Sequence, residues 1–173
     1  MSTTIAILSD SHRKPELTKE AIEHLKKQGA QYIIHAGDLE IEHNLKLLKD
    51  SSLPYVSVFG NNDHNLIQYS NQYNINKEPY YFKIKENTFK LMHLPYYLSG
   101  DTDIVVFGHT HQFSVEYTNN TLFLNPGEIC ARNKNLTECA LLKIDDTNFI
   151  VKYFFKTPNE QIWESQDYIY ERV

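Results

Sequence analysis

The sequence predicts an α/β fold, a two-sheet β-sandwich flanked by helices, and two observations support this class. In residues 1–60, short apolar runs alternate with amphipathic segments, a pattern typical of parallel strands joined by helical crossovers. After residue 78 the chain consists mostly of strand-like runs separated by turns. Two sheets packed face to face, with helices outside, would bury both patterns.

The first part of the chain predicts three strands and two helices in alternation. The strands cover residues 4–9, 32–35 and 55–59. The first helix begins at Pro15, which suits the first turn of a helix, and ends before Gly29. The second helix covers residues 41–49. Residues 64–78 are polar and rich in Asn, and they predict a loop or a short, poorly specified helix.

The rest of the chain predicts strands at residues 79–85, 88–93, 103–107, 112–118, 121–125, 138–144 and 148–155. Asn119-Asn120 and Asp145-Asp146 are typical of hairpin turns between them. Residues 156–173 are polar with interspersed aromatic residues. They are compatible with a closing helix and with a segment that wraps the surface.

The composition is that of a soluble globular protein, and residues 1–173 are expected to form a single domain. Hydrophobic residues make up 41% of the chain and charged residues 23%, so it can build a full core. The net charge of −5, without a Lys/Arg block, argues against a long nucleic acid as partner. No signal-like segment or long apolar stretch is present, so we expect a cytoplasmic protein without membrane contact.

Two other sequence features bear on the compartment and on partners. Cys130 and Cys139 are too few for a disulfide framework, and we expect them to be reduced thiols. The aromatic pairs Tyr80-Tyr81 and Tyr96-Tyr97 are explained by strand packing in the first instance. A homodimer interface or a wall that stacks on a nucleobase is the alternative.

Five polar clusters each follow an apolar run. They are Asp10-Ser11-His12, Gly37-Asp38, Gly60-Asn61-Asn62-Asp63, His93 and Gly108-His109-Thr110-His111. The carboxyl end of a buried strand is where an open α/β sheet places its site. Each cluster alone has a plainer interpretation as a turn. Together their Asp, His and Asn side chains are the ligands that a pair of divalent metal ions requires, which predicts a metallohydrolase.

The remaining histidines receive more ordinary interpretations. His24 lies in the middle of the first helix among Lys and Glu, and we expect it to be solvated. His35 precedes the turn at Asp38 and is expected in the core or beside a ligand rather than as a ligand itself. His43 opens the second helix and could line the cleft.

The series Asp-x-His, Gly-Asp, Gly-Asn, His and Gly-His-x-His resembles the calcineurin-like metallophosphoesterase superfamily, over residues 5 to about 155. Length and layout resemble its small bacterial and archaeal phosphodiesterase branch. The resemblance implies that one metal ion is held by Asp10, His12, Asp38 and His111. It implies that the other is held by Asp38, Asn61, His93 and His109, so that Asp38 bridges the ions. It also implies a β-sandwich flanked by helices.

Such a centre predicts a dinuclear-metal phosphodiesterase that acts on a small phosphodiester. Two ions roughly 3.5–4 Å apart clamp the phosphate oxygens and lower the pKa of a shared water, and the hydroxide attacks phosphorus in line. Asp38, Asn61 and His109 are the residues expected to hold the hydroxide and the phosphate. Ligation by nitrogen and oxygen without thiolate favours Mn²⁺, with Zn²⁺, Fe or Ni²⁺ as alternatives.

The sequence departs from the family pattern at three places. Asn62 stands where many members carry a His that assists the leaving group, and a neutral amide has no proton to give at neutral pH. His64, two residues on, is a candidate substitute near the leaving group, although a solvated loop residue is the simpler interpretation. Leu94-Pro95 replaces Gly-His after His93, and Glu128 replaces a small hydroxyl residue.

Two other functions remain open. One relative in this fold is a scaffold subunit of a membrane-coat complex, so a non-catalytic metal-binding scaffold is one alternative. Keeping all seven ligands argues against it, because unpaired acids and imidazoles are costly to cluster without a metal. The second alternative is a phosphatase or nuclease directed at nucleotides.

Overall fold

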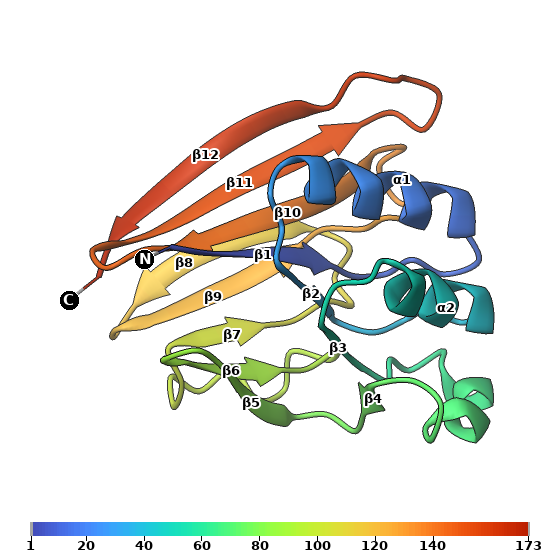
Figure 1. The fold of residues 1–173 in the computed structure, drawn as a ribbon, viewed down its shortest axis with the longest axis horizontal. Helices are drawn as coiled ribbons and strands as arrows, with labels where there is room; N and C mark the ends of the chain where they lie inside the picture. The colour runs from blue at the N-terminus through green and yellow to red at the C-terminus, as the bar shows by residue number, and fades with distance from the viewer. Residues whose placement is uncertain (1, 173) are drawn as a thin grey trace.

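The chain folds into two β-sheets that pack face to face (Figure 1). The computed structural model describes residues 2–172. The larger sheet contains, in spatial order, β12 (Glu164–Glu171), β11 (Asn148–Lys156), β10 (Thr137–Ile144), β1 (Thr3–Leu8), β2 (Tyr32–His35), β3 (Tyr55–Val58) and β4 (Ile75–Asn76). The smaller contains β5 (Tyr80–Ile84), β6 (Asn87–Leu91), β7 (Ile104–Val106), β9 (Thr121–Pro126) and β8 (Phe113–Thr118). The predicted sandwich of two sheets is confirmed.

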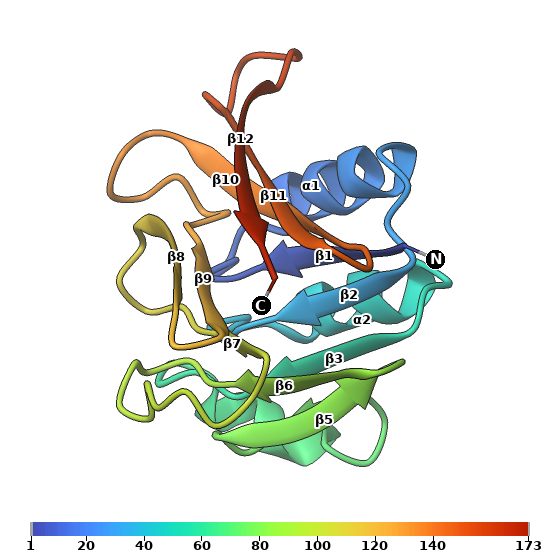
Figure 2. The ribbon, with the colours of Figure 1, turned by 90° about the vertical axis from the view of Figure 1, so that its left-hand side faces the viewer.

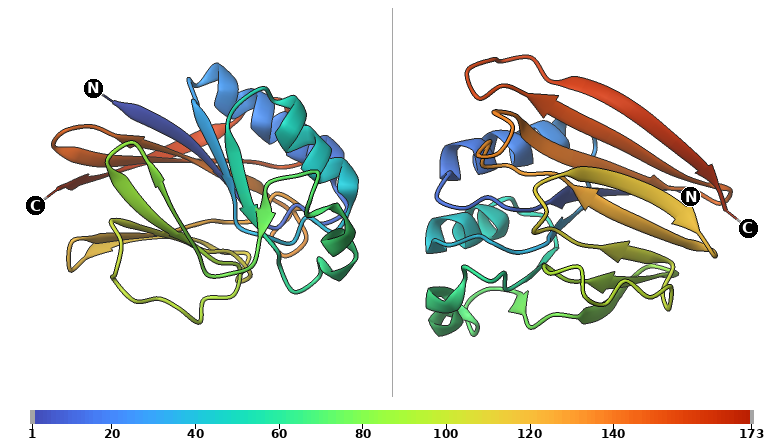
Figure 3. Two further views of the ribbon diagram at one scale, coloured as in Figure 1. Left: turned by 60° about the horizontal axis from the view of Figure 1, so that its bottom comes forward. Right: turned by 180° about the vertical axis from the view of Figure 1, so that it is seen from behind.

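Both α-helices cover the outer face of the seven-stranded sheet. They are α1 (Pro15–Lys27) and α2 (Glu42–Asp50), which lie side by side in Figures 1 and 2. Figure 3 shows them on the side of this sheet that faces away from the five-stranded sheet. Ala21, Ile22 and Leu25 form the buried face of α1. Within residues 2–172 the outer face of the five-stranded sheet carries no α-helix, so the helices flank the sandwich on one side.

The strand β1 shows how the two layers share one core. Its side chains alternate between the faces of the sheet, as in any strand. Ile5 and Ile7 are buried between the sheets, and Ala6 and Leu8 are buried against the helices. A strand covered on both faces needs a continuous apolar run, which is why Thr4-Ile5-Ala6-Ile7-Leu8 does not alternate with polar residues.

Strand direction places the site. β1, β2, β3 and β4 are parallel in one sheet, and β6, β7 and β9 are parallel in the other. In Figure 1 the arrows of β1, β6 and β7 point to the same end of the sandwich. The polar segments that follow β1, β2, β3, β6 and β7 therefore meet at one edge of the molecule.

Two segments have structure that the sequence did not specify. Residues 64–78 contain the 3-10 helix η1 (His64–Tyr69), in agreement with the short helix predicted there, and the two-residue strand β4, which was not predicted. Residues 164–171 form β12, which pairs antiparallel with β11 along its whole length. Of the two predicted options for this terminus, the helix is wrong, because the open edge of β11 offers backbone partners to an extended chain.

The expected turns are confirmed. Asn119 and Asn120 have φ of 49° and 61° and join β8 to β9. Asp145 accepts hydrogen bonds from the backbone N–H groups of Thr147 and Asn148 in the turn between β10 and β11. Asn and Asp suit these places because they tolerate the left-handed region and bond to nearby backbone.

The prediction for His24 is wrong. Its ring stacks on Trp163 at 4.9 Å between centroids and meets the edge of Phe154 at 4.5 Å. Burial lowers the pKa of this imidazole, and the charge of Lys27 lowers it further. The sequence placed His24 among charged neighbours on α1, but contacts from β11 and from the segment before β12 cover it.

Two other expectations concern cysteines and membranes. Cys130 and Cys139 are buried free cysteines in the structure. Among residues 2–172, no helix has the length and apolar character needed to cross a membrane.

Candidate metal centre

Five loops meet at the carboxyl ends of the strands. Asp10 follows β1, Asp38 follows β2, Asn61 follows β3, His93 follows β6, and His109 and His111 follow β7. Backbone hydrogen bonds tie these loops together: the N–H of Asp10 donates to Gly37 at 3.0 Å, and that of His12 donates to Asp38 at 2.8 Å. The N–H of Gly108 donates to His93 at 3.1 Å, which links the two loops of the smaller sheet.

Glycines in the motifs permit this close approach. A Cβ at Gly60 would lie 2.1 Å from Oδ1 of Asp38, and one at Gly108 would lie 2.1 Å from Oγ of Ser9. Both distances are far inside van der Waals contact, so neither position accepts a side chain without moving the neighbouring ligand loop. The Gly-Asn and Gly-His pairs of the sequence are therefore explained by the packing of one site loop on another.

The site loops are held in an uncommon backbone conformation. Six residues with side chains take φ between 45° and 67°: Asp10, His12, Asp38, Glu40, His109 and His111. Each such residue costs roughly 1–3 kcal/mol and persists only where the surroundings hold it. Strain concentrated on the predicted ligands and on one residue beside them marks this edge as a functional site.

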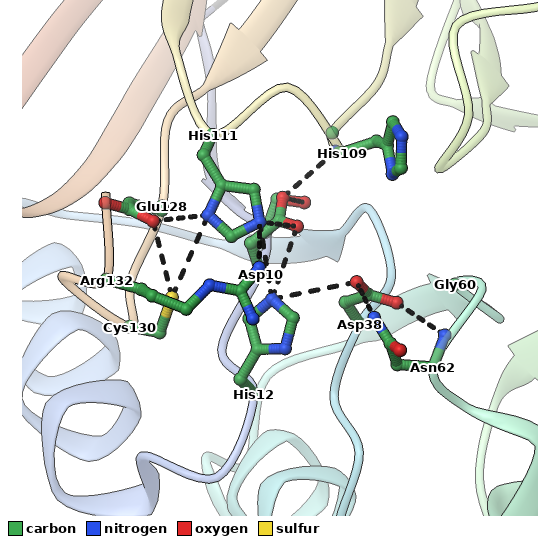
Figure 4. A network of polar contacts seen from close by, with 12 residues as sticks. Asp10, His12, Asp38, Gly60, Asn62, His109, His111, Glu128, Cys130 and Arg132 are labelled. Carbon is green, nitrogen blue, oxygen red and sulfur yellow. Dashed lines mark hydrogen bonds and ion pairs between the residues drawn. The ribbon is translucent and has the colours of Figure 1, made fainter. Parts of the chain in front are cut away.

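The first group of side chains is buried, and we call it the buried half. It consists of Asp10, His12 and His111, together with the shared Asp38 (Figure 4). Oδ1 of Asp10 lies 3.2 Å from Nε2 of His111. Nε2 of His12 lies 3.4 Å from Nε2 of His111 and 3.6 Å from Oδ2 of Asp38.

The second group is more accessible, and we call it the open half. It consists of Asn61, His93 and His109, again with Asp38. Nε2 of His93 lies 3.4 Å from Oδ2 of Asp38 and 3.0 Å from Oδ1 of Asn61. Nδ1 of His109 lies 3.1 Å from the same oxygen of Asn61. Asp38 therefore stands between the halves, as the bridging role predicted for it requires.

Hydrogen bonds at Nδ1, the ring nitrogen that points away from the cluster, fix the orientation of three imidazoles. Nδ1 of His12 lies 3.2 Å from a carboxylate oxygen of Glu40, and Nδ1 of His93 lies 2.8 Å from the carbonyl oxygen of Ala36. Nδ1 of His111 hydrogen-bonds to the carboxylate of Glu128. An N–H donated at Nδ1 leaves the lone pair of Nε2 directed at the cluster, the arrangement found around metal-bound histidines.

The residues fit divalent cations. Oδ1 of Asp10 is buried and makes no hydrogen bond of good geometry within residues 2–172, and the imidazole of His111 at 3.2 Å is its nearest partner. An ionised oxygen in such a place is costly. Ligand atoms of Asp10, His12 and Asp38 all lie within 4.8 Å of one another. Carboxylate oxygens and imidazole nitrogens thus converge on one place, and a cation there would satisfy all of them. Carboxylate, imidazole and amide ligands suit Mn²⁺, Zn²⁺ or Fe.

The electrostatics of the cluster agree. Burial raises the pKa of Asp10, but the imidazoles of His111 and His12 beside it outweigh this effect and hold its pKa far below the usual range. Burial lowers the pKa of His111, but its bonds to Asp10, Cys130 and Glu128 raise it to about 10. The carboxylates therefore keep protons on the imidazoles, and a divalent cation would have to displace those protons.

The structure brings together all seven predicted metal ligands, while the other predicted residues lie differently. The side-chain amide of Asn62 donates to Oδ2 of Asp38 at 2.8 Å, so in this structure it contacts the shared carboxylate. His64 is exposed and lines a groove of about 660 Å³ next to Asn61. His43 lines a different cavity, between α1 and α2.

His35 lies in the core, as predicted. Its Nδ1 accepts the N–H of Gly37 at 3.2 Å, and its Nε2 donates to the hydroxyl of Ser11 at 2.7 Å. Burial lowers its pKa to about 3, so the ring is neutral. It braces the loops that carry Asp10 and Asp38 against each other.

Sequence reasoning missed Glu40 and Arg132 at the site, and it named Asp63 as part of a polar cluster without giving it a role. Glu40 orients His12, Arg132 approaches His111, and Asp63 accepts the backbone N–H groups of Asp38, Glu40 and Gly60. The sequence did contain one signal for Glu40. It lies two residues after Asp38, the same spacing that separates Asp10 from His12. Glu128 was noted only as a departure from the family pattern, and its contact with His111 explains it.

Comparisons with known proteins agree with this geometry. The family profile described as the calcineurin-like phosphoesterase superfamily domain matches residues 3–147. A phosphodiesterase of Methanocaldococcus jannaschii is 27% identical over 139 residues, which cover 73% of this chain and 84% of that protein.

Two solved structures share the fold. A predicted phosphoesterase of Streptococcus pneumoniae superposes with a TM-score of 0.74 at 22% identity, over 99% of both chains. Vacuolar protein sorting 29 of Cryptosporidium parvum superposes with a TM-score of 0.80 at 18% identity, also over 99% of both chains. With the family profile spanning most of its length, the chain belongs to the calcineurin-like phosphoesterase superfamily, in its small archaeal and bacterial branch, and is a hydrolase of phosphoric esters.

Proposed function

We propose that the protein is a phosphodiesterase that hydrolyses a small phosphodiester with two divalent cations. One cation would be held by Asp10, His12, Asp38 and His111. The other would be held by Asp38, Asn61, His93 and His109. One observation carries this proposal: the inward nitrogens of His12, His93 and His111 converge on two buried carboxylates while their outer nitrogens are already bonded.

When bound, the two cations supply Lewis-acid stabilisation of a phosphate group and lower the pKa of water at neutral pH. The protein holds the metal ligands in fixed positions. Glu40, Ala36 and Glu128 fix the imidazole rings, and Asp63 holds the backbone of the Asp38 and Gly60 loops together. A site held by such contacts needs little rearrangement during the reaction, which is a main source of catalytic rate.

The open half is where the substrate would enter. His109 and Asn61 are exposed, whereas Asp10, His12 and His111 are buried. The groove of about 660 Å³ beside Asn61 is lined in part by Phe59 and Ile67, so it suits an organic substituent of the ester. The relative named a phosphodiesterase supports a diester as substrate, and nitrogen and oxygen ligation supports Mn²⁺ as the ion.

The position of Cys130 supports a centre without thiolate. Its Sγ lies 4.0 Å from Nδ1 of His111 and 3.4 Å from Glu128, on the outer side of the imidazole. The nitrogen that faces Asp10 is Nε2, at the other side of the ring. We therefore assign Cys130 no ligand role.

The test combines metal content with turnover. Purified protein is loaded with Mn²⁺, its metal is quantified, and hydrolysis of bis(p-nitrophenyl) phosphate is compared with that of p-nitrophenyl phosphate. We expect two ions per chain and a preference for the diester. One ion at saturation, or turnover of the monoester alone, contradicts the proposal.

A scaffold protein is the second candidate, because the sorting protein superposes with the higher TM-score of the two structures described above. Both functions allow metal binding, so a rise in melting temperature with Mn²⁺ does not separate them. Turnover does. Protein that binds two ions and hydrolyses neither ester would favour the scaffold.

A further inference from the structure

A cleft of about 340 Å³ opens beside the buried half, and basic side chains gather in it. Arg13 and Lys14 come from the segment before α1, and Arg132 comes from the loop after β9. The cleft contains one carboxylate, Glu40, whose oxygens are engaged by His12 at 3.2 Å and by Arg13 at 3.3 Å. In a chain with a net charge of −5, this is a local concentration of positive charge at the mouth of the site.

The backbone around Arg132 is fixed to the site. One carboxylate oxygen of Glu128 accepts the N–H groups of Asn133 at 2.7 Å and Lys134 at 3.1 Å. The N–H of Cys130 donates to the carbonyl of Asp10 at 3.1 Å. The position of Arg132 beside the cluster is therefore set by its loop and does not depend on its own side chain.

The guanidinium of Arg132 contacts Nε2 of His111, and this contact would be lost if that nitrogen bound a metal ion. Its Nη2 lies 3.1 Å from Nε2 of His111, its one side-chain polar contact within residues 2–172 (Figure 4). That nitrogen has a single lone pair, which we assign to a metal ion. The ammonium of Lys14 makes no hydrogen bond or ion pair within the described chain. Both side chains are exposed at the cleft, so each is free to bind an anion from outside the protein.

We propose that this cleft is an anion subsite that takes a second phosphate of the substrate, next to the phosphate bound at the metals. The inference rests on the proposed function, because it assigns the first phosphate to the metal centre. Since Arg132 reaches a metal-ligand nitrogen directly, the second phosphate must be adjacent, as in a diphosphate group. A planar guanidinium binds two phosphate oxygens in parallel, which gives both affinity and orientation.

The substrate class that follows is phosphoric esters with a diphosphate group, and an isolated phosphodiester leaves the cleft without a ligand. The test measures binding of thymidine 5′-phosphate and thymidine 5′-diphosphate to protein kept in excess Mn²⁺, by isothermal titration calorimetry. We expect the diphosphate to bind about tenfold more tightly, the value of one charge-assisted hydrogen bond. Arg132→Met should reduce this ratio to about threefold or less, and Arg132→Lys should restore part of it.

The control is Lys143→Met, which removes one positive charge from an exposed position on β10. It should leave the tenfold ratio in place, and melting curves check that each variant is folded. Equal affinity for the two nucleotides in the natural protein, or a ratio that Arg132→Met does not change, would overturn the subsite. Hydrolysis of bis(p-nitrophenyl) phosphate is measured in parallel. Its absence counts against the proposed function, whereas the binding ratio tests the subsite without turnover.

Discussion

The two halves of the metal centre share Asp38 but are built differently. In the buried half, Asp10 is 0% exposed and His111 is 4% exposed, and a carboxylate bonds to each imidazole from behind. In the open half, Asn61 and His109 are exposed, and His93 is oriented by a neutral backbone carbonyl. A carboxylate partner makes an imidazole a stronger metal ligand than a neutral partner does.

This difference in burial and charge suits the two halves to different roles. A buried, anionic set of ligands is suited to retaining a cation, and an exposed set with an amide is suited to exchanging water for substrate. We expect one metal ion to bind tightly in the buried half and a second to bind more weakly in the open half.

The largest effect is expected from Asp38→Asn, which removes the charge that both halves share. Loss of two cations forfeits several kcal/mol of transition-state stabilisation, so activity should fall by about 10³-fold or more. Metal analysis should show that both sites weaken. Asp167→Asn on β12, an exposed carboxylate far along the larger sheet, is the control and should bind metal normally. An Asp38→Asn protein that keeps two ions and full activity would refute the shared role.

Glu128→Gln should weaken metal binding in the buried half alone and so make the two halves more alike. The substitution replaces the carboxylate behind His111 by a neutral amide, which resembles the neutral partner of His93. We expect the tighter metal ion to lose about 10–100-fold in affinity, as is usual when such an outer partner is removed. Competition with a chelator measures both constants. Equal weakening of the two ions would contradict the assignment of the tight site to the buried half.

Asn62→His tests the open half. A histidine there would supply a general acid that the amide lacks, so turnover of alkyl diesters should rise about tenfold more than turnover of aryl diesters. Because the Asn62 amide also donates to Asp38 at 2.8 Å, Asn62→Ala separates loss of this bond from gain of an acid. If leaving-group dependence is the same in all three proteins while metal content stays full, protonation must come from elsewhere.

The smallest effect is a pH dependence of metal affinity in the buried half. Metal binding needs a neutral imidazole, and the pKa of His111 is raised to about 10, so protons compete with the cation at neutral pH. Affinity should therefore increase with pH between about 6.5 and 8.5, by up to about tenfold per unit for one released proton. Glu128→Gln removes one of the contacts that raise the pKa of His111, so the slope should flatten. A slope that is unchanged in this variant would show that another group releases the proton.

Much of the fold and of the site could be predicted because the signals are local. Apolar runs at β1, β2 and β3 and the helix start at Pro15 depend on neighbouring residues, and they lie where the sequence places them. The ligand motifs end those runs, so parallel strands bring them to one edge. β12 and the packing of His24 were missed because each depends on a partner distant in the chain, β11 for the strand and Trp163 for the ring.

The sequence by itself determined which side chains could bind metal and that they follow the ends of buried strands, because apolar runs locate the strands along the chain. Only the tertiary structure decided how each ligand is oriented and charged. Glu40, Glu128 and Arg132 act on His12 and His111 across 17 or more residues of chain. Left-handed backbone at six site residues also needs contacts between loops to hold it. Orientation, burial and pKa are properties of neighbours in space, and no local pattern contains them.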